Sequence, residues 1–140
     1  MARILIVDDD PDIRLLLRLE LSAEGHTIAE AGDGAAALAA LEQSPADLVL
    51  LDIMMPVLDG WGVLRELLPD HPPVVVVTAL ATHDDRHLVD LLDQGAIDVL
   101  AKPFDPGRLV LLVEEVVDLD AEGRAAYRQR RLDAVRGGPT

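Results

Sequence analysis

Acids, a threonine and a lysine stand directly after short apolar runs of this 140-residue chain. The residues in question are Asp8, Asp9, Asp52, Thr78 and Lys102. Lys102 is the sole lysine of the sequence. If the apolar runs are parallel strands of one sheet, their carboxyl ends share one edge, where open α/β sheets bind their ligands. We therefore expect carboxylates, a hydroxyl and an ammonium group to meet in one crevice.

Asp8, Asp9 and Asp52 predict a site for a hard divalent cation. Two ionised carboxylates about 4 Å apart repel each other by about 4 kcal/mol at an effective dielectric constant of 20, so a cation or a proton must offset the repulsion. Ligands that are all oxygen favour Mg²⁺. An aspartate beside such an ion can attack a phosphoryl group, and Lys102 would neutralise charge on the transferred oxygens. In the alternative interpretation residues 8–10 merely cap a helix, which explains Asp10 but not Asp52 or Lys102.

Strand-like and helix-like segments alternate along the chain and would position these side chains. We expect strands at residues 3–7, 27–30, 47–51, 73–77 and 97–100, and helices at 11–24, 34–43, 60–68, 84–94 and 106–117. Five such units with short loops predict an α/β fold, a doubly wound five-stranded parallel sheet with five flanking helices. Residues 121–136 are expected either to extend the last helix or to form a sixth.

Charge and composition narrow the function classes. The net charge of −14 argues against binding to nucleic acid. The charge is uneven, because residues 1–120 sum to −17 and residues 121–140 to +3. The chain has no cysteine and no run of the roughly 20 apolar residues that a membrane span needs. We expect no secretory leader, because charged residues interrupt the short apolar stretch at the start. We expect a cytoplasmic protein without disulfides or a membrane anchor.

Over roughly residues 2–118 the chain resembles the receiver domains of two-component response regulators. Four segments carry the resemblance: Ile4–Asp10, Leu50–Pro56 with the following Asp59-Gly60, Thr78-Ala79, and Lys102-Pro103-Phe104. The resemblance implies a flavodoxin-like (CheY-like) sheet of order 2-1-3-4-5. It also implies a receiver domain at residues 1–119, followed by an Arg-rich extension at 120–140 that is helical or disordered.

The resemblance implies a role for each residue of the predicted crevice. Asp52 would accept a phosphoryl group from a histidine kinase or a phosphotransfer protein, and Thr78 and Lys102 would bind the phosphoryl oxygens. Magnesium would be held by four residues: Asp8, Asp9, Asp52 and the backbone carbonyl of Met54. The Lys102–Pro103 peptide bond would be cis, an isomer that is common only before proline.

One position departs from the family pattern. The switch region implied by the resemblance comprises Thr78, Ala79, Val99 and Pro103, and the family often has an aromatic residue at the position of Val99. A β-branched side chain has no ring to rotate and is stiff at χ1. We therefore expect signalling through shifts of the loop and helix at residues 79–90. Met54 and Leu80 are both apolar and cannot orient an attacking water, which predicts a long-lived phosphoaspartate.

Alternative functions remain open at this point. A degenerate receiver could serve as a protein-binding scaffold without phosphorylation. Gly32-Asp33-Gly34 opens a match to a dinucleotide-binding fingerprint, although it leaves the acids and the lysine without a role. His83 and His87 have the spacing of zinc ligands on a helix, but the segment lacks the glutamate of the zinc-peptidase motif.

Two surfaces are candidates for protein partners. The helix at residues 106–117 is apolar over most of its circumference, so either the C-terminal extension covers it or it mediates docking or a homodimer with the preceding helix. The resemblance places kinase docking near the helix at residues 11–24. About 22 residues follow the last receiver helix, too few for a DNA-binding module. We therefore expect a stand-alone receiver that acts on a downstream protein target.

Overall fold

Short apolar segments form the strands, and longer segments with capping acids form the helices. The computed structural model describes residues 2–55, 58–67, 71–79 and 85–136. The strands are β1 (Arg3–Val7), β2 (Thr27–Ala31), β3 (Leu48–Leu51), β4 (Val74–Thr78) and β5 (Asp98–Ala101). The helices are α1 (Pro11–Ala23), α2 (Gly34–Gln43), α3 (Gly60–Glu66), α4 (Asp85–Asp93), α5 (Pro106–Val117) and α6 (Ala121–Arg136).

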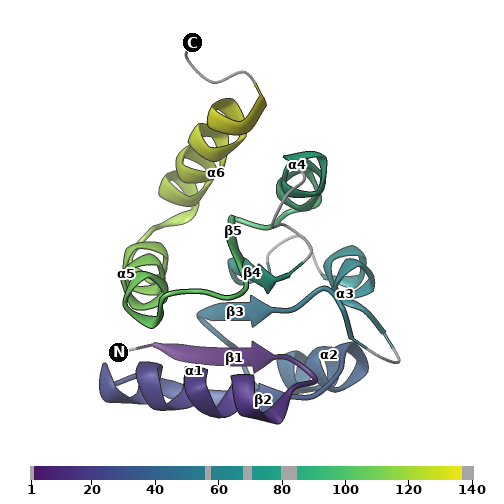
Figure 1. Ribbon diagram of the computed structural model, residues 1–140, viewed down its shortest axis with the longest axis vertical. Helices are drawn as coiled ribbons and strands as arrows, with labels where there is room; N and C mark the ends of the chain where they lie inside the picture. Colours follow the sequence, from purple (N-terminus) through teal and green to yellow (C-terminus); the bar gives the residue numbers. More distant parts are fainter. Residues whose placement is uncertain (1, 56–57, 68–70, 80–84, 137–140) are drawn as a thin grey trace.

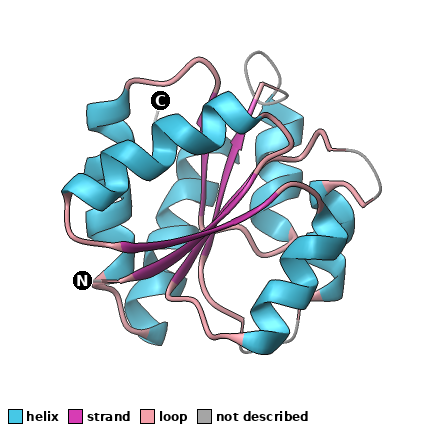
Figure 2. Ribbon diagram, turned by 90° about the horizontal axis from the view of Figure 1, so that it is seen from below, coloured by secondary structure: helices cyan, strands magenta, loops and turns pink. Residues whose placement is uncertain are grey.

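The five strands form one parallel sheet in the order β2-β1-β3-β4-β5. This confirms the predicted fold class and strand order. Figure 1 shows α1 and α5 on one face of the sheet and α2, α3 and α4 on the other, and Figure 2 shows how strongly the sheet twists. Every residue of β3 and of β4 is buried, as expected for central strands covered on both faces.

Two apolar cores lie on the two faces of the sheet. One core packs Ile4 and Ile6 of β1 against Leu17 of α1 and Leu109 of α5. The other packs alternate strand residues against α2, α3 and α4. Because successive strand residues point to opposite faces, a short uninterrupted apolar run supplies both cores at once.

Aspartates start the helices that follow the strands. Asp10, Asp33, Asp59 and Asp105 are the N-caps of α1, α2, α3 and α5, and each carboxylate accepts a hydrogen bond from a backbone N–H of the first turn. Such caps satisfy amides that would otherwise lack a partner, typically for about 1 kcal/mol each. The interpretation of Asp10 as a cap is therefore confirmed. Asp8 and Asp52 are not among these N-caps, so capping does not explain them.

The five predicted flanking helices are present, and the C-terminal extension forms a sixth helix, which is one of the two outcomes expected for residues 121–136. α5 ends at Val117, and α6 begins at Ala121 after a turn in which Asp120 accepts a hydrogen bond from the Gly123 amide at 2.7 Å. In Figure 1 α6 lies above β5, between α5 and α4. None of the described helices combines the length and the hydropathy needed to cross a bilayer.

Candidate functional site

Strand register brings the predicted carboxylates together. Val7 at the end of β1 pairs with Leu51 at the end of β3, so Asp8 and Asp52 leave the sheet side by side. The backbone continues this alignment, because the Asp52 amide donates to the Val7 carbonyl at 2.9 Å. Thr78 pairs with Ala101, which places Lys102 one residue beyond the end of the sheet. Four separate strand ends therefore meet at one edge.

Lys102 joins the two buried carboxylates. Its Nζ donates to Asp8 Oδ2 at 2.7 Å and to Asp52 Oδ2 at 3.1 Å. Asp8 is 2 % exposed and Asp52 is 6 % exposed. Burying two acids with one base leaves a net charge of −1 in a poorly solvated place, and such a group is stable only with good hydrogen bonds. We call Asp8, Asp9, Asp52 and Lys102 the acidic site.

Asp9 completes a set of oxygen donors that suits a divalent ion. One carboxylate oxygen each from Asp8, Asp9 and Asp52 lies within 4.8 Å of the other two. Asp9 is exposed, so the set opens to solvent on its side. Hard oxygen donors, a net negative charge and an open side fit Mg²⁺, which keeps several waters when it binds to proteins. The predicted carboxylate ligands are thus in one place, and their role as ligands stays a prediction.

Burial and the shared lysine shift two pKa values. Burial raises the pKa of Asp8 above its usual value, although hydrogen bonds from Lys102 and from the Asp10 amide oppose the shift. Burial would lower the pKa of Lys102, but its hydrogen bonds to Asp8 and Asp52 outweigh burial and raise it. The lysine is therefore held in its charged form, and Asp8 takes up a proton more readily than a free aspartate.

A tight turn after β3 holds Asp52. The Met54 amide donates to Asp52 Oδ1 at 3.2 Å, and the Gly60 amide donates to the Ile53 carbonyl at 2.9 Å. A Cβ atom on Gly60 would stand 2.5 Å from the Asp52 carbonyl oxygen, so only glycine allows this approach. The Met54 backbone therefore lies at the acidic site, while metal binding by its carbonyl stays a prediction. Its apolar side chain is 62 % exposed.

The predicted switch residues lie around β4 and β5. Thr78 is fully buried, and its carbonyl accepts from the Lys102 amide at 3.1 Å. Ala79 is exposed, and Val99 contacts the core on the α2, α3 and α4 side of the sheet. The Lys102–Pro103 bond is cis, as predicted. Leu80 and most of the predicted signalling loop lie outside the described residues.

Packing around Gly34 excludes the dinucleotide-binding interpretation of the Gly32-Asp33-Gly34 motif. Asp33 caps α2, accepting from the Ala36 amide at 2.8 Å, and the Gly34 amide donates to the Leu58 carbonyl at 3.1 Å. A phosphate would need this amide and the space that Leu58 fills. The sequence match therefore reflects a capped, tightly packed turn. For the zinc alternative, His83 lies outside the described residues.

Two polar clusters were missed by the sequence reasoning. Arg14 donates from Nη1 to the Asp8 carbonyl at 2.6 Å and from Nε to Glu30 at 3.0 Å, bracing the loop after β1. Asp98 is 6 % exposed and binds Tyr127 and Arg131 of α6. An acid inside an apolar strand, Ile97-Asp98-Val99-Leu100, was the signal that a partner was required.

The sequence and the fold are similar to those of proteins with known names. The model of the response regulator receiver domain matches residues 4–114. The probable transcriptional regulator ycf27 of Guillardia theta is 41% identical over 116 residues, which cover 82% of this chain and 45% of that protein. Response regulator PleD of Caulobacter vibrioides is 39% identical over 155 residues, covering 97% of this chain and 34% of PleD.

Solved structures agree with these matches. The receiver domain of NtrX from Brucella abortus has a TM-score of 0.76 and 38% identity, covering 84% of this chain and 99% of that one. The receiver domain of the Francisella response regulator 1452 has a TM-score of 0.78 and 28% identity, covering 84% and 97%. The chain spans less than half the length of the two curated relatives, so the absence of a DNA-binding module stays a prediction. Because the matched region spans most of the chain and contains the whole acidic site, we conclude that the chain belongs to the response regulator receiver domain family of two-component systems.

Proposed function

We propose that the chain is a phosphorylatable receiver in which Asp52 accepts a phosphoryl group with the help of Mg²⁺. One observation carries the proposal: Lys102 bridges Asp8 and Asp52 at 2.7 and 3.1 Å, with an oxygen of Asp9 within reach of both acids. A degenerate receiver would not need to bury two carboxylates and then neutralise only one of them. The full set of charged groups supports transfer chemistry over a passive scaffold.

The residues of the acidic site divide the work of the transfer. An oxygen of the Asp52 carboxylate attacks the phosphorus of a phosphohistidine, the P–N bond breaks, and its electron pair leaves with the imidazole ring. Lys102 then exchanges its hydrogen bond to Asp52 for one to a phosphoryl oxygen, so that a positive charge stays beside the new negative charge. Asp8, Asp9, Asp52 and the Met54 carbonyl would hold Mg²⁺, and the bound ion would neutralise and orient the phosphoryl oxygens.

Thr78 is placed to respond to the new group. It ends β4 beside the strand that leads to Lys102, and its own carbonyl already binds the Lys102 amide. A hydroxyl that binds a phosphoryl oxygen would draw the segment after β4 toward the acidic site. We propose that this movement, together with that of Lys102, is the conformational signal.

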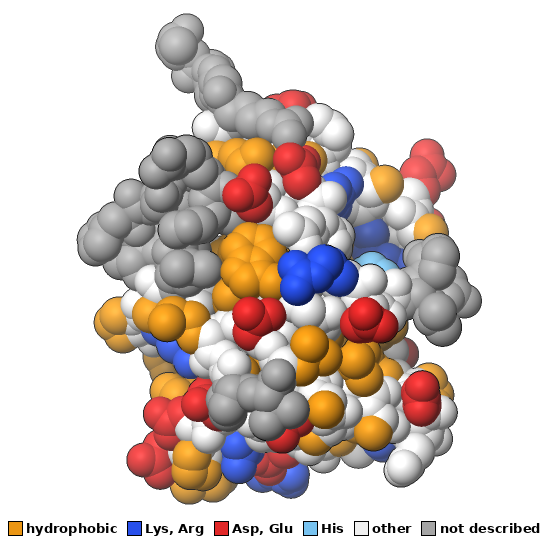
Figure 3. All heavy atoms as spheres, turned by 90° about the vertical axis from the view of Figure 1, so that its right-hand side faces the viewer, with side chains coloured by type: hydrophobic (Ala, Val, Ile, Leu, Met, Phe, Trp, Pro, Cys, Tyr) orange, Lys and Arg blue, Asp and Glu red, His pale blue; other side chains and the backbone are white. Residues whose placement is uncertain are grey.

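The proposed partners follow from the family and from exposed apolar side chains. Leu15 and Leu19 of α1 are 53 % and 61 % exposed, which suits docking of a histidine kinase or a phosphotransfer protein on the helix that follows Asp8 and Asp9. A downstream protein target, or a second copy of the chain bound through α4 and α5, would read the signal. The face shown in Figure 3 spreads acidic side chains among apolar ones, in keeping with the net charge of −14 and with protein rather than nucleic-acid partners.

Acetyl phosphate tests the proposal directly. The chain is incubated with acetyl phosphate and Mg²⁺, and the intact mass and the position of the adduct are measured. We expect one phosphoryl adduct on Asp52 that is lost in Asp52→Asn and without Mg²⁺, and that is retained in the control Asp12→Asn, which removes an exposed acid from the first turn of α1. An adduct that survives Asp52→Asn, or no adduct at all, refutes the proposal.

A further inference from the structure

Strand β5 connects the acidic site to the C-terminal helix. It contains only four residues, Asp98–Ala101. Lys102 follows directly at one end and binds Asp8 and Asp52. At the other end Asp98 is buried and binds α6 through its carboxylate. Because both groups stand on one short strand, a shift of the β5 backbone would move Lys102 and Asp98 together.

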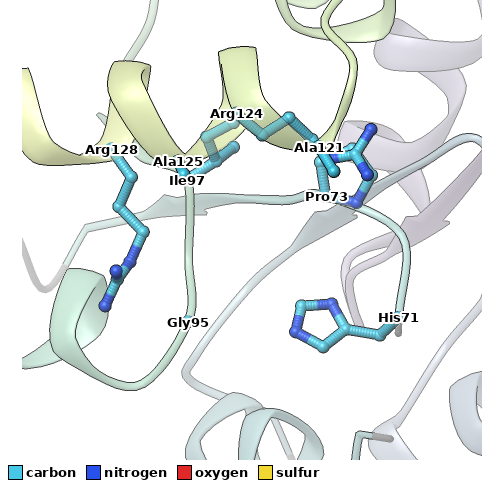
Figure 4. Close-up of a pocket in the computed structure, with 8 residues that line it drawn as sticks. All are labelled: His71, Pro73, Gly95, Ile97, Ala121, Arg124, Ala125 and Arg128. Atoms are coloured by element: carbon cyan, nitrogen blue, oxygen red, sulfur yellow. The ribbon is translucent and has the colours of Figure 1, made fainter. Parts of the chain in front are cut away.

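Polar contacts anchor α6 to β5 and to α4. The Tyr127 hydroxyl donates to Asp98 Oδ2, and Arg131 Nε donates to Asp98 Oδ1 at 2.8 Å. Arg128 Nε donates to the Leu92 carbonyl in the last turn of α4 at 2.7 Å. Figure 4 shows the Arg128 side chain extending from α6 toward the loop that carries Gly95. Burial of the ring and the hydrogen bond to Asp98 raise the pKa of Tyr127.

Few apolar side chains of α6 take part in this docking. In the described part of α6, only Tyr127 and Leu132 are buried side chains. A cavity of about 330 Å³ lies beside Arg124 and Arg128, and another of about 300 Å³ lies beside Tyr127 and Arg131. Elements with few buried apolar contacts are those that detach at low free-energy cost. Weakening the Asp98 contacts should therefore make release of α6 easier.

We propose that docking of α6 onto Asp98 is coupled to the state of Asp52, so that α6 is held in the unphosphorylated chain and released on phosphorylation. A phosphoryl group places its oxygens beyond the present position of the Asp52 carboxylate, and Lys102 must follow them. The pull on β5 loosens the geometry of the Asp98 contacts at its other end. This inference rests on the function proposed for Asp52 and adds the element that reports it.

Hydrogen exchange on the whole chain measures the release. Mg²⁺ with beryllofluoride, which mimics a phosphoryl group on aspartate, is added to the unmodified protein, and amide exchange is followed by mass spectrometry. We expect amides of α6 to exchange faster by about fivefold or more, the lower end of typical coupling between sites, while α2 on the far side of the sheet keeps its rate. Asp52→Asn should abolish the response.

Reciprocal coupling gives a second measurement with a matched control. Arg131→Gln removes one anchor from Asp98, while Arg130→Gln removes the same charge from an exposed neighbour whose guanidinium carbon lies 5.8 Å from the centre of the Tyr127 ring. Because coupling is reciprocal, loosening α6 should favour the phosphorylated state. We expect Arg131→Gln to bind beryllofluoride with Mg²⁺ about fivefold more tightly than the unmodified chain, and Arg130→Gln to change this affinity by less than about twofold. Tyr127→Phe is a second variant that weakens the same contact and keeps the ring.

The outcomes separate the two proposals. If Asp52 acquires the phosphoryl group but α6 exchanges at an unchanged rate, the coupling is refuted and the phosphoacceptor function stands. The same conclusion follows if Arg131→Gln, Tyr127→Phe and Arg130→Gln all bind beryllofluoride with the affinity of the unmodified chain. If Asp52 acquires no adduct, both proposals fall.

Discussion

Replacing Lys102 with methionine tests how much the shared lysine stabilises the acidic site. The substitution keeps most of the side-chain volume and removes the ammonium that binds Asp8 and Asp52. Oxygens of the two acids lie within 4.8 Å, so at an effective dielectric constant of 20 their unscreened repulsion is about 3.5 kcal/mol or more. Breaking a buried ion pair typically costs 3–5 kcal/mol. We expect Lys102→Met to lower the free energy of unfolding by about 3 kcal/mol, or the Tm by roughly 10 °C.

The loss of stability in Lys102→Met should become smaller at lower pH and when Mg²⁺ is added. Burial already raises the pKa of Asp8 in the folded chain, and loss of the ammonium raises it further. A carboxyl whose folded-state pKa lies above its unfolded value takes up a proton on folding, so the variant regains stability as the pH falls toward that pKa. Millimolar Mg²⁺ should also restore stability, because the ion supplies the missing positive charge.

Urea unfolding in the presence of a chelator measures this effect. Unfolding of Lys102→Met is followed at about pH 8 and about pH 5, and then with Mg²⁺ added. The control is Arg108→Met, which removes a charge from an exposed position of α5 and should change stability by less than about 0.5 kcal/mol. The reasoning fails if Lys102→Met is as stable as the unmodified chain at about pH 8, or if its deficit grows on acidification.

Two further predictions concern packing and titration. Gly60→Ala should lower the free energy of unfolding by about 1–3 kcal/mol, because its Cβ would stand 2.5 Å from the Asp52 carbonyl oxygen. The control is Gly107→Ala, whose Cβ would meet its nearest atom at 3.5 Å and should leave the free energy of unfolding unchanged. Urea unfolding compares the two variants. Tyr127 is the only tyrosine, so phenolate absorbance should show ionisation well above the usual pKa of 10.0 while the chain stays folded. Because its folded-state pKa is raised, the stability that Tyr127 provides is full below the unfolded pKa and is lost as the pH rises above it.

Sequence alone predicted the sheet and the acidic site because both follow from periodicity and order along the chain. The predicted helix at residues 34–43 has the observed bounds of α2, Gly34–Gln43. The first helix ends at Ala23 rather than at residue 24, since helix ends are decided by local capping. The proximity of Asp8, Asp52 and Lys102 could be predicted, because the carboxyl ends of parallel strands share one edge of the sheet.

The remaining features depend on contacts between distant segments. The sequence of residues 121–136 does not predict that Tyr127 and Arg131 bind Asp98. That pairing depends on the chain turning back toward β5 after α5 ends at Val117. From the sequence, residues 121–136 could extend α5 or form a separate helix. The apolar surface of α5 could be covered by this segment or by a partner. The structure shows a separate helix that adds Tyr127 to the core packed by α5, while Leu111 of α5 remains 73 % exposed.

Because β5 is an edge strand of the sheet, the C-terminal segment that packs on it also covers part of that edge. β5 pairs with β4 on one side only, so its other side offers backbone amides and carbonyls to any extended polypeptide that approaches. Tyr127 and Arg131 lie over Asp98 on this strand and occupy part of that approach. A recombinant fragment that stops at residue 119 would lose this shield and would leave Asp98 without its two side-chain partners. Such a fragment invites strand addition between molecules, so the Arg-rich tail belongs in any version of the protein made for study.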